Sequence, residues 1–398
     1  MGVHRTIYMD HSATTFVKPE VLEVMIPYFS EHFGNPSSLY GIARYAKKAI
    51  DIARIQTARA LAADPEEIYF TSGGSESDNW AIKGVALANR KRGNHIITTQ
   101  IEHHAVLHTC RFLEKEGFEI TYLPVDRYGL VSPVDLEKAI TDKTILISVM
   151  YANNEIGTIE PVAELGLIAR KHKVYFHTDA VQAIGNIPID VKSQNIDLLS
   201  LSAHKFYGPK GVGALYIRKG VRIGNLIHGG GQESNRRAGT ENSAGIVGLG
   251  KAIELATADI PGHNAKVKSL RDRLISGVLE QIPDSRLNGH PEKRLTGNFN
   301  VSFEFIEGES MLLWLDDEGI CASTGSACTS GSLEPSHVLL ATGLPVEISH
   351  GSLRLTLGDT NTEEEVDIVL ETLPKIVKKL RDMSPLSRNN GKKGGCDV

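Results

Sequence analysis

Long apolar runs, an excess of basic charge and closely spaced cysteines are all missing from this sequence. No apolar run approaches the ~18 residues that a membrane-spanning helix needs, so we expect no membrane association. The 43 Lys and Arg are outnumbered by 48 Asp and Glu, for a net charge of −5, which provides no general attraction to nucleic acids. Four cysteines scattered over 398 residues are typical of a reducing compartment rather than of a disulfide scaffold. Because the N-terminus also lacks the apolar core of a signal peptide, we expect a cytoplasmic protein.

The segments that are present alternate between strand-like and helical patterns. Hydrophobic residues make up 41% of the sequence and charged residues 23%, as in an ordinary globular protein long enough for two or three domains. A helix is expected at 19–32, and an α/β series then predicts a mostly parallel, helix-covered sheet of seven strands. The strand candidates are residues 68–71, 95–99, 120–124, 144–149, 174–178, 197–202 and 213–217.

Beyond about residue 258 the pattern changes to that of an α+β domain. A helical pattern at 264–281 precedes a strand-like run at 298–303, and a charged helix is expected at 362–382. The tail beyond that helix is polar and rich in glycine and lysine, which predicts disorder. The predicted organisation is an N-terminal segment (1–18) that packs with the small domain, a large domain (19–258), a small domain (259–383) and a disordered tail (384–398).

Lys205 and Asp179 each stand at the end of a predicted strand. Ligands of open α/β sheets bind at the edge where the carboxyl ends of the strands meet. A lysine is usually a solvated surface residue, but a partly buried lysine amine readily loses its proton and attacks carbonyl groups. An aspartate there could cap a helix or keep the ring nitrogen of pyridoxal phosphate protonated. The two residues together favour a pyridoxal phosphate site.

Further polar residues follow the neighbouring strands. Gly74 and Ser75 lie in a glycine turn before a predicted helix, where backbone N–H groups could bind a phosphate; the alternative is a plain turn with Ser75 as the helix cap. His103 could stack on an aromatic cofactor and Asn154 could bind its phenolic oxygen, although both residue types are common in purely structural roles. Thr240 precedes another predicted helix and could cap it or reach a phosphate.

A metal site is the alternative interpretation of the histidines near position 103. His103, His104 and His108 lie close to Cys110 in the sequence. No second cluster of ligand residues has the spacing typical of a zinc site, so we expect no resident metal.

Two residues of the predicted small domain carry further chemistry. Cys328 lies among small residues between 321 and 332, a composition typical of an exposed loop, where a thiol can act as a nucleophile. A buried, inert cysteine is the usual alternative, and it suits Cys321 better. Arg354 lies in the alternating run 351–357 and is a candidate clamp for a substrate carboxylate; the alternative is a surface salt bridge.

Taken together, these motifs resemble the cysteine desulfurases of the NifS/IscS group, in the class-V aminotransferase family of fold-type I pyridoxal phosphate enzymes. The resemblance follows nearly the whole chain in order, and the long loop around Cys328 resembles that of the group I enzymes. The residues that carry it are 8–15, 33–36, 71–79, 153–157, 177–182, 202–205, 237–240, 325–330 and 381–386.

The resemblance implies a homodimer that converts L-cysteine to L-alanine and passes the sulfur on. Cys328 would take the sulfur as a persulfide for an acceptor such as an iron–sulfur scaffold protein, and it could also ligate a transferred iron–sulfur cluster. Lys205 would hold pyridoxal phosphate and move a proton, Asp179 would pair with the ring nitrogen, and His103 would stack on the ring. Arg354, helped by Asn154, would bind the substrate carboxylate.

The resemblance also implies which residues bind the remaining cofactor groups. Asn154 and Gln182 would bind the phenolic oxygen of the cofactor. The phosphate would be bound by Gly74, Ser75, Ser202, His204 and Thr240, the last from the partner subunit.

Other functions remain compatible with parts of this set. A selenocysteine lyase or a class-V aminotransferase would use the same cofactor residues, although an aminotransferase has no need of Cys328. A non-catalytic sulfur-relay or scaffold protein would not need Lys205, Asp179, His103 and Cys328 together.

Overall fold

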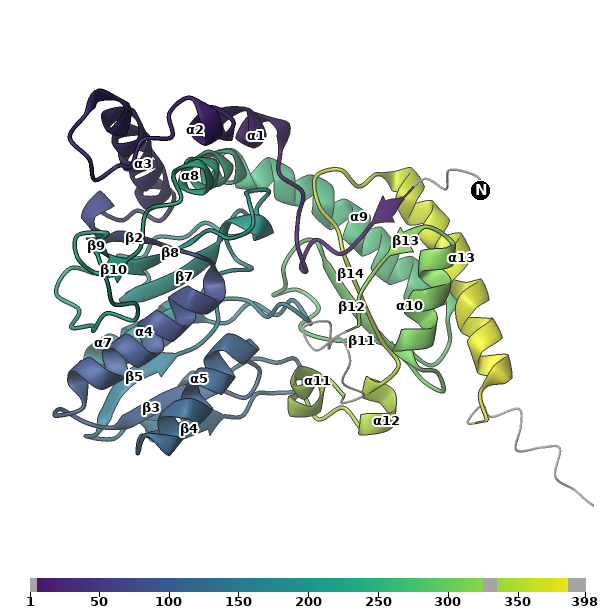
Figure 1. The fold of residues 1–398 in the computed structure, drawn as a ribbon. Helices are drawn as coiled ribbons and strands as arrows, with labels where there is room; N and C mark the ends of the chain where they lie inside the picture. The colour runs from purple at the N-terminus through teal and green to yellow at the C-terminus, as the bar shows by residue number, and fades with distance from the viewer. Residues whose placement is uncertain (1–5, 325–334, 386–398) are drawn as a thin grey trace, which may run out of the picture.

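Two sheets of different size form the centre of the molecule. The computed structural model describes residues 6–324 and 335–385. Within them, a seven-stranded sheet and a three-stranded sheet lie side by side, each packed against its own helices (Figure 1). Cys328 and most of the predicted tail, 384–398, lie outside the described residues.

The larger sheet confirms the seven expected strands and their mostly parallel arrangement. Its strand order is β2-β8-β7-β6-β5-β3-β4. Strand β8 runs antiparallel to both of its neighbours, and the other strands run parallel to one another. The strands are β2 (Ile68–Thr71), β3 (His95–Thr99), β4 (Glu119–Leu123), β5 (Thr144–Ser148), β6 (Tyr175–Asp179), β7 (Leu198–Ser202) and β8 (Gly213–Ile217).

Helices cover both faces of this sheet, so its central strands are buried. All residues of β5 and β7 are buried, as expected for a parallel sheet between two helical layers. Adjacent residues point to opposite faces: Ile96 and Leu146 pack in the core under α4 and α5, whereas Ile97 and Ile147 pack in the core under α3, α7 and α8. These helices are α3 (Gly41–Ala60), α4 (Gly74–Asn89), α5 (His104–Lys115), α7 (Val162–Lys171) and α8 (Ser243–Ala258).

The smaller sheet has its own apolar core. Its strands β11 (Ser285–Leu287), β12 (Asn298–Phe303) and β14 (Ser352–Thr356) are antiparallel. Near the N-terminus, β1 (Ile7–Tyr8) pairs in parallel with β13 (Ile320–Cys321), and Ile7 and Met9 are buried in this second core. The helices that pack there are α9 (Ile260–Gln281), α10 (Gly308–Asp317) and α13 (Glu363–Met383).

The helix expected at 19–32 is wrong as a single element. The structure has α1 (Pro19–Met25) and α2 (Pro27–Ser30) instead. Pro27 has no N–H to donate and its ring crowds the preceding turn, so the chain begins a new helix there. The remaining short elements are α6 (Pro133–Ala139), α11 (His337–Ala341), α12 (Val346–Ser349), β9 (Gly231–Gln232) and β10 (Arg237–Ala238).

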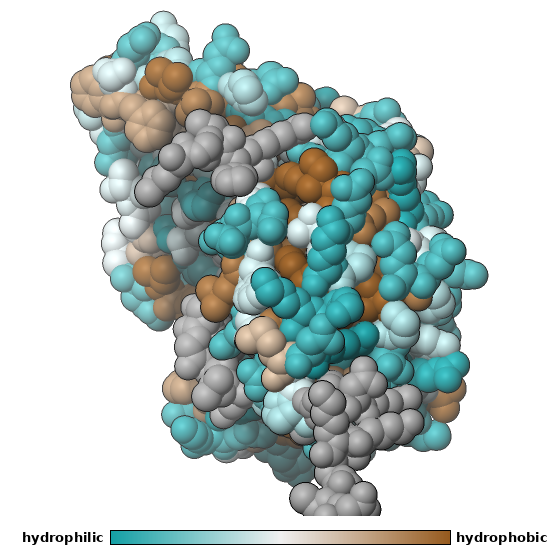
Figure 2. All heavy atoms as spheres, turned by 90° about the vertical axis from the view of Figure 1, so that its right-hand side faces the viewer, coloured by the Kyte–Doolittle hydropathy of each residue, from teal (hydrophilic) through white to brown (hydrophobic). Residues whose placement is uncertain are grey.

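Helix α13 begins with an acidic turn. Its first turn carries Glu363, Glu364 and Glu365, and the Thr362 hydroxyl accepts the N–H of Glu365 in a capping box. Figure 2 views the molecule from this side and shows mainly hydrophilic side chains, with apolar ones between them. Across residues 6–324 and 335–385, no helix combines the length and the apolar character that crossing a membrane requires.

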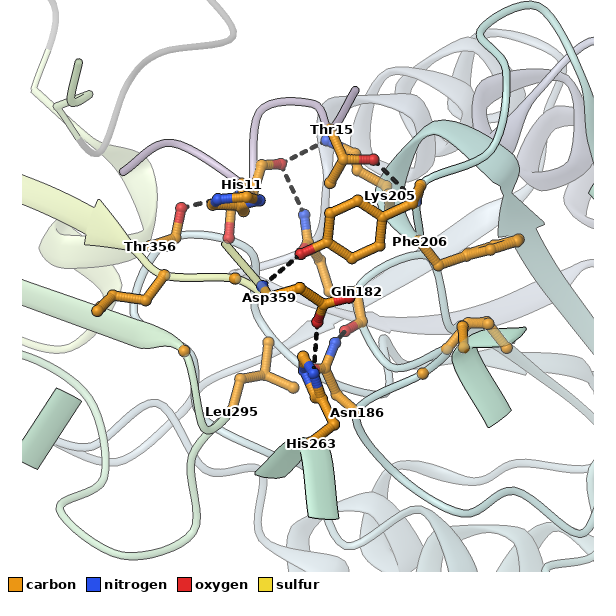
Figure 3. A pocket seen from close by; sticks show the side chains of 18 of the residues that line it. His11, Thr15, Gln182, Asn186, Lys205, Phe206, His263, Leu295, Thr356 and Asp359 are labelled. Carbon is orange, nitrogen blue, oxygen red and sulfur yellow. Dashed lines mark hydrogen bonds and ion pairs between the residues drawn. The ribbon is translucent and has the colours of Figure 1, made fainter. Parts of the chain in front are cut away.

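Asp359 lies in the loop after β14 and forms ion pairs and a hydrogen bond with residues near the larger sheet (Figure 3). Its carboxylate forms ion pairs with His263, at 2.6 Å, and with Lys18. Its backbone N–H donates to the Tyr207 hydroxyl at 2.8 Å, and Tyr207 lies two residues after Lys205. Burial alone would raise the pKa of Asp359, but the hydrogen bonds from His263 and Lys18 outweigh burial and hold that pKa well below its usual value. The contact therefore stabilises the folded protein when the carboxylate is ionised.

Replacing Asp359 with asparagine should lower the free energy of unfolding by about 1 kcal/mol at pH 7, since the partly exposed ion pairs are screened by water. A carboxyl pKa that folding lowers stabilises the protein above the unfolded-state value of about 4, and this contribution is lost as the pH falls further. The difference between wild type and Asp359→Asn in urea unfolding should therefore shrink below about pH 4.

Asp367→Asn is the matched control, because Asp367 forms an ion pair on the exposed surface of α13. Asp367→Asn should leave the urea unfolding curve almost unchanged, both at pH 7 and below about pH 4. A loss for Asp359→Asn that does not depend on pH would contradict this account.

Candidate active site

A polar cavity of about 330 Å³ opens at the carboxyl ends of β5, β6 and β7. Among the described residues, it contains every predicted site residue except Thr240, and Cys328 lies outside the described residues. Thr240 is exposed elsewhere on this chain, and Asn242, not Thr240, caps α8. The lining residues are Ser12, Ala13, Gly74, Ser75, Asp78, His103, Met150, Ala152, Asn154, Asp179, Val181, Gln182, Ser202, His204, Lys205 and Arg354.

Lys205 is held against the N-terminal segment. It ends the short 3₁₀ turn Ala203–Lys205, which follows β7 directly. Its Nζ donates to the carbonyl oxygens of Ser12 and Ala13, the latter at 2.7 Å. The Gln182 side-chain amide donates to the same Ser12 carbonyl at 3.0 Å, and Figure 3 shows the two side chains approaching it together. The N-terminal turn therefore positions both residues.

Two buried carboxyl groups occupy one end of the cavity. Asp179 ends β6, and its Oδ1 accepts the Val181 N–H at 2.9 Å in a turn. Burial raises the pKa of Asp179 to about 6, although the Val181 N–H and the Lys205 charge act in the opposite direction. Asp78, on α4, is 1% exposed, and burial together with the Asp179 charge raises its pKa well above the usual value.

His103 stands at the start of α5 as an uncharged ring. Its Nδ1 accepts the Ala105 N–H at 3.1 Å and caps the helix. Burial, the Lys205 charge and neighbouring histidines lower the pKa of His103 to about 4. In its neutral form the ring therefore carries its hydrogen on Nε2. His204 is similar, since burial and Lys205 lower its pKa to about 4.

Arg354 reaches the cavity from β14. Its guanidinium forms an ion pair with Asp10 at 2.9 Å and donates to the Asn154 carbonyl at 3.0 Å. Asp10 also accepts a hydrogen bond from the Ser323 hydroxyl at 2.7 Å. Arg354 is only 2% exposed, so the alternative of a surface salt bridge is wrong. Its Nε has no hydrogen-bond partner in the part of the chain that the structure describes, which is unusual for a buried donor.

The N-terminus of α4 forms another wall. The helix begins at Gly74, and no side chain caps it, so the alternative role of Ser75 as the helix cap is wrong. A Cβ on Gly74 would lie 2.7 Å from Val181 Cγ2, so only glycine fits this close approach. The first N–H groups of a helix have no partner within the helix, and they attract anions.

Two charged residues of this site, Asp78 and Asp10, were not predicted from the sequence. Both lie inside the motifs that carried the family resemblance, which was the available signal. Asp78 follows Gly74 by one helical turn and therefore lies on the same side of α4. Asp10 and Arg354 are far apart in the sequence, so the local sequence pattern could not predict their ion pair.

The donors and acceptors of the cavity fit pyridoxal phosphate. A buried carboxylate suits a protonated ring nitrogen, and the first turn of α4 suits a phosphate. Lys205 lines the same cavity and can form a Schiff base with an aldehyde. Arg354 also lines the cavity, and its unpartnered Nε is a buried donor that an anionic group could satisfy.

The chain is similar to known cysteine desulfurases over almost its whole length. The family model described as Aminotransferase class-V matches residues 7–369. A protein named cysteine desulfurase IscS, from Methanosarcina thermophila, is 66% identical over 384 residues, which cover 96% of this chain and 95% of that protein.

Solved structures agree with this assignment. A NifS-like protein superimposes with a TM-score of 0.89 at 42% identity, covering 94% of this chain and 100% of that one. SspA in complex with cysteine has a TM-score of 0.80 at 40% identity, covering 90% of this chain and 100% of that one. The α/β architecture of this chain is accordingly that of the fold-type I enzymes. The chain belongs to the class-V aminotransferase family, and within that family to the cysteine desulfurases, which depend on pyridoxal phosphate.

Proposed function

We propose that this protein takes sulfur from L-cysteine, releases L-alanine and holds the sulfur as a persulfide on Cys328. The observation that carries the proposal is the convergence of Lys205, Asp179 and Arg354 on one cavity. Amine, buried carboxylate and buried guanidinium are the groups that a pyridoxal phosphate enzyme needs for an amino acid substrate. The similar protein SspA was solved in complex with cysteine, which supports this substrate.

Four residues would bind the ring of the cofactor and its substituents. When bound, pyridoxal phosphate withdraws electrons from the carbon atoms of the substrate. Asp179 would pair with the ring nitrogen, and the neutral His103 would lie against the ring without competing for that carboxylate. Asn154 and Gln182 line the cavity and would bind the phenolic oxygen.

The phosphate would lie at the N-terminus of α4. Gly74 and Ser75 would donate backbone and hydroxyl groups, and Ser202 and His204 would approach from the end of β7. We infer that Thr240 completes this set from a second subunit, since within its own chain Thr240 is exposed and outside the cavity.

Arg354 would bind the substrate carboxylate, with Asn154 beside it. The guanidinium is already oriented by Asp10 and by the Asn154 carbonyl, and its Nε is the unused donor. A charge-assisted bond to a buried arginine is strong and directional. The amino group of the substrate would then lie towards Lys205, which lines the same cavity.

Lys205 and Cys328 would carry the chemical steps. Lys205 would take the proton from the α-carbon and return it. The Cys328 thiolate would attack the substrate sulfur, so that an S–S bond forms while the C–S bond breaks. The electron pair of the broken bond stays with the carbon fragment, which takes up protons and leaves as L-alanine.

The residues that flank the Cys328 segment support its position near the substrate. Ser323, before it, donates to Asp10 beside Arg354. Ser336, after it, donates from its hydroxyl to the buried Glu155 at 2.5 Å, and Glu155 is adjacent to Asn154. Both ends are therefore anchored beside the groups that would bind the substrate carboxylate. A selenocysteine lyase or an aminotransferase, the remaining alternatives, would not require Cys328 to accept sulfur.

Cys328→Ala should abolish persulfide formation and reduce alanine production from L-cysteine by at least about a hundredfold, because the sulfur then has no acceptor. Wild type and variant are mixed with L-cysteine, and alanine and protein-bound persulfide are both measured. The variant should keep the yellow absorbance of the bound cofactor, which controls for folding. Alanine formation by the variant at the wild-type rate would refute the role of Cys328.

A homodimer would cover an exposed apolar surface on the N-terminal helices. Large apolar side chains on α1, α2, α3 and their connections are open to solvent, with Phe29 67%, Phe33 67% and Leu39 91% exposed. Single exposed apolar residues are ordinary, but a gathered set marks an interaction surface. We infer that a second copy of the chain packs on this surface and contributes its Thr240.

The double variant Phe29→Asp, Leu39→Asp should shift the sedimentation coefficient from dimer towards monomer, since it would bury charge in the interface. It should also retain pyridoxal phosphate less well, because Thr240 of the partner would be withdrawn. Leu313→Asp is the control, since Leu313 is 72% exposed on α10, outside this surface. A wild-type protein that sediments as a monomer would contradict the inference.

The remaining inferences concern the organisation of the chain and its setting. We infer a small domain of 259–383 joined by the N-terminal segment 1–18, supported by the pairing of β1 with β13, and a large domain of 19–258.

The name IscS of a 66% identical relative supports a role in iron–sulfur cluster assembly, with a scaffold protein as the sulfur acceptor. We infer that this transfer takes place in the cytoplasm. Transfer of an assembled cluster through Cys328 would be a further use of the same thiol.

A further inference from the structure

Asp78 is a second buried carboxyl group at the end of the cavity where Asp179 lies. It is 1% exposed and lines the cavity from α4. One oxygen of Asp78, one oxygen of Asp179 and one ring nitrogen of His103 all lie within 4.8 Å of one another. One cofactor ring nitrogen needs a single carboxylate, so the second acid has no role in the function proposed above.

The immediate surroundings of Asp78 do not compensate a negative charge. Its Oδ1 has no hydrogen-bond partner among the described residues. Nε2 of His177 lies 3.6 Å from that oxygen. That ring is fully buried between the hydroxyls of Ser148 and Ser200, at 2.8 and 3.0 Å, and burial lowers the pKa of His177 to about 3. His177 is therefore uncharged at neutral pH.

The other groups around Asp78 also disfavour its ionised form. Burial and the Asp179 charge both raise its pKa, and the buried Glu102 adds to this effect. A hydrogen bond from Ser200 acts in the opposite direction but does not outweigh them. His103 is neutral, because its own pKa is lowered to about 4. Two carboxyl groups this close and this buried cannot both be ionised without a large cost.

We propose that Asp78 keeps its proton at neutral pH, so that Asp179 alone carries the negative charge at this end of the cavity. The proposal rests on the proposed pairing of Asp179 with the cofactor ring nitrogen. One carboxylate then matches one protonated nitrogen. Because Asp78 is protonated, the single negative charge of the pair stays on Asp179.

Infrared spectroscopy of the holoenzyme tests the proton directly. Protein labelled with ¹³C at aspartate carboxyl carbons should show, at pH 7.5, a carbonyl band of a protonated acid that shifts with the label. The band should be absent from Asp78→Asn, which preserves shape without an acid, and present in Glu102→Gln, the matched control. Should Asp78→Asn fail to fold, the labelled band of the wild type still decides whether a buried aspartic acid is protonated.

The cofactor absorbance gives a second measurement, which distinguishes a neutral Asp78 from an ionised one. If Asp78 is neutral, Asp78→Asn changes no charge, and the pH at which the yellow absorbance titrates should stay within about 0.3 units of wild type. If Asp78 is ionised, the substitution removes a negative charge beside the cofactor and should lower that pH by about one unit or more.

Three outcomes would overturn the proposal: no labelled aspartate band in the wild type, a band that survives in Asp78→Asn, or a titration that moves by a unit. None of these depends on alanine or persulfide formation. A protein that fails to desulfurate cysteine would refute the proposed function, whereas the infrared band reports on Asp78 independently.

Discussion

A buried negative charge at the end of a parallel strand is the constraint on which the site depends. The central strands of the larger sheet are buried and covered by helices on both faces, and the polar groups of the site gather where β5, β6 and β7 end. Asp179 stands at that edge almost without access to water, and a buried charge needs a partner. The charge of Lys205 stabilises this carboxylate, and so would the ring nitrogen of the bound cofactor. A neutral acid beside it, as proposed for Asp78, adds no second negative charge.

Three parts of the chain meet at the site. The larger sheet supplies Asp179 and Lys205, the smaller sheet supplies Arg354, and the N-terminal segment lies between them. Its Ser12 carbonyl accepts hydrogen bonds from Lys205 and Gln182, while Asp10 pairs with Arg354. The ion pairs of Asp359 hold the same parts together nearby. Loosening this segment should therefore disturb both cofactor and substrate groups.

The local sequence pattern predicted the strands and helices correctly where a single physical effect decided the structure of a segment. Apolar runs in alternation with helical patterns predicted the seven strands, because a parallel sheet buried on both faces needs continuous apolar strands. The prediction was wrong for the helix at 19–32, where the missing N–H of Pro27 outweighed the helical pattern. Ser75 was an acceptable helix cap by type, but α4 begins before it, at Gly74.

The sequence by itself determined which residues could carry the chemistry, because a lysine, an aspartate and a histidine at strand ends meet at one edge of a parallel sheet. It also determined the family, since the motifs follow one another along nearly the whole chain. Only the tertiary structure decided that Arg354 is buried rather than on the surface, and that Asp78 faces Asp179. Burial and distance set the charge of a group, and both arise from contacts between segments far apart in the chain.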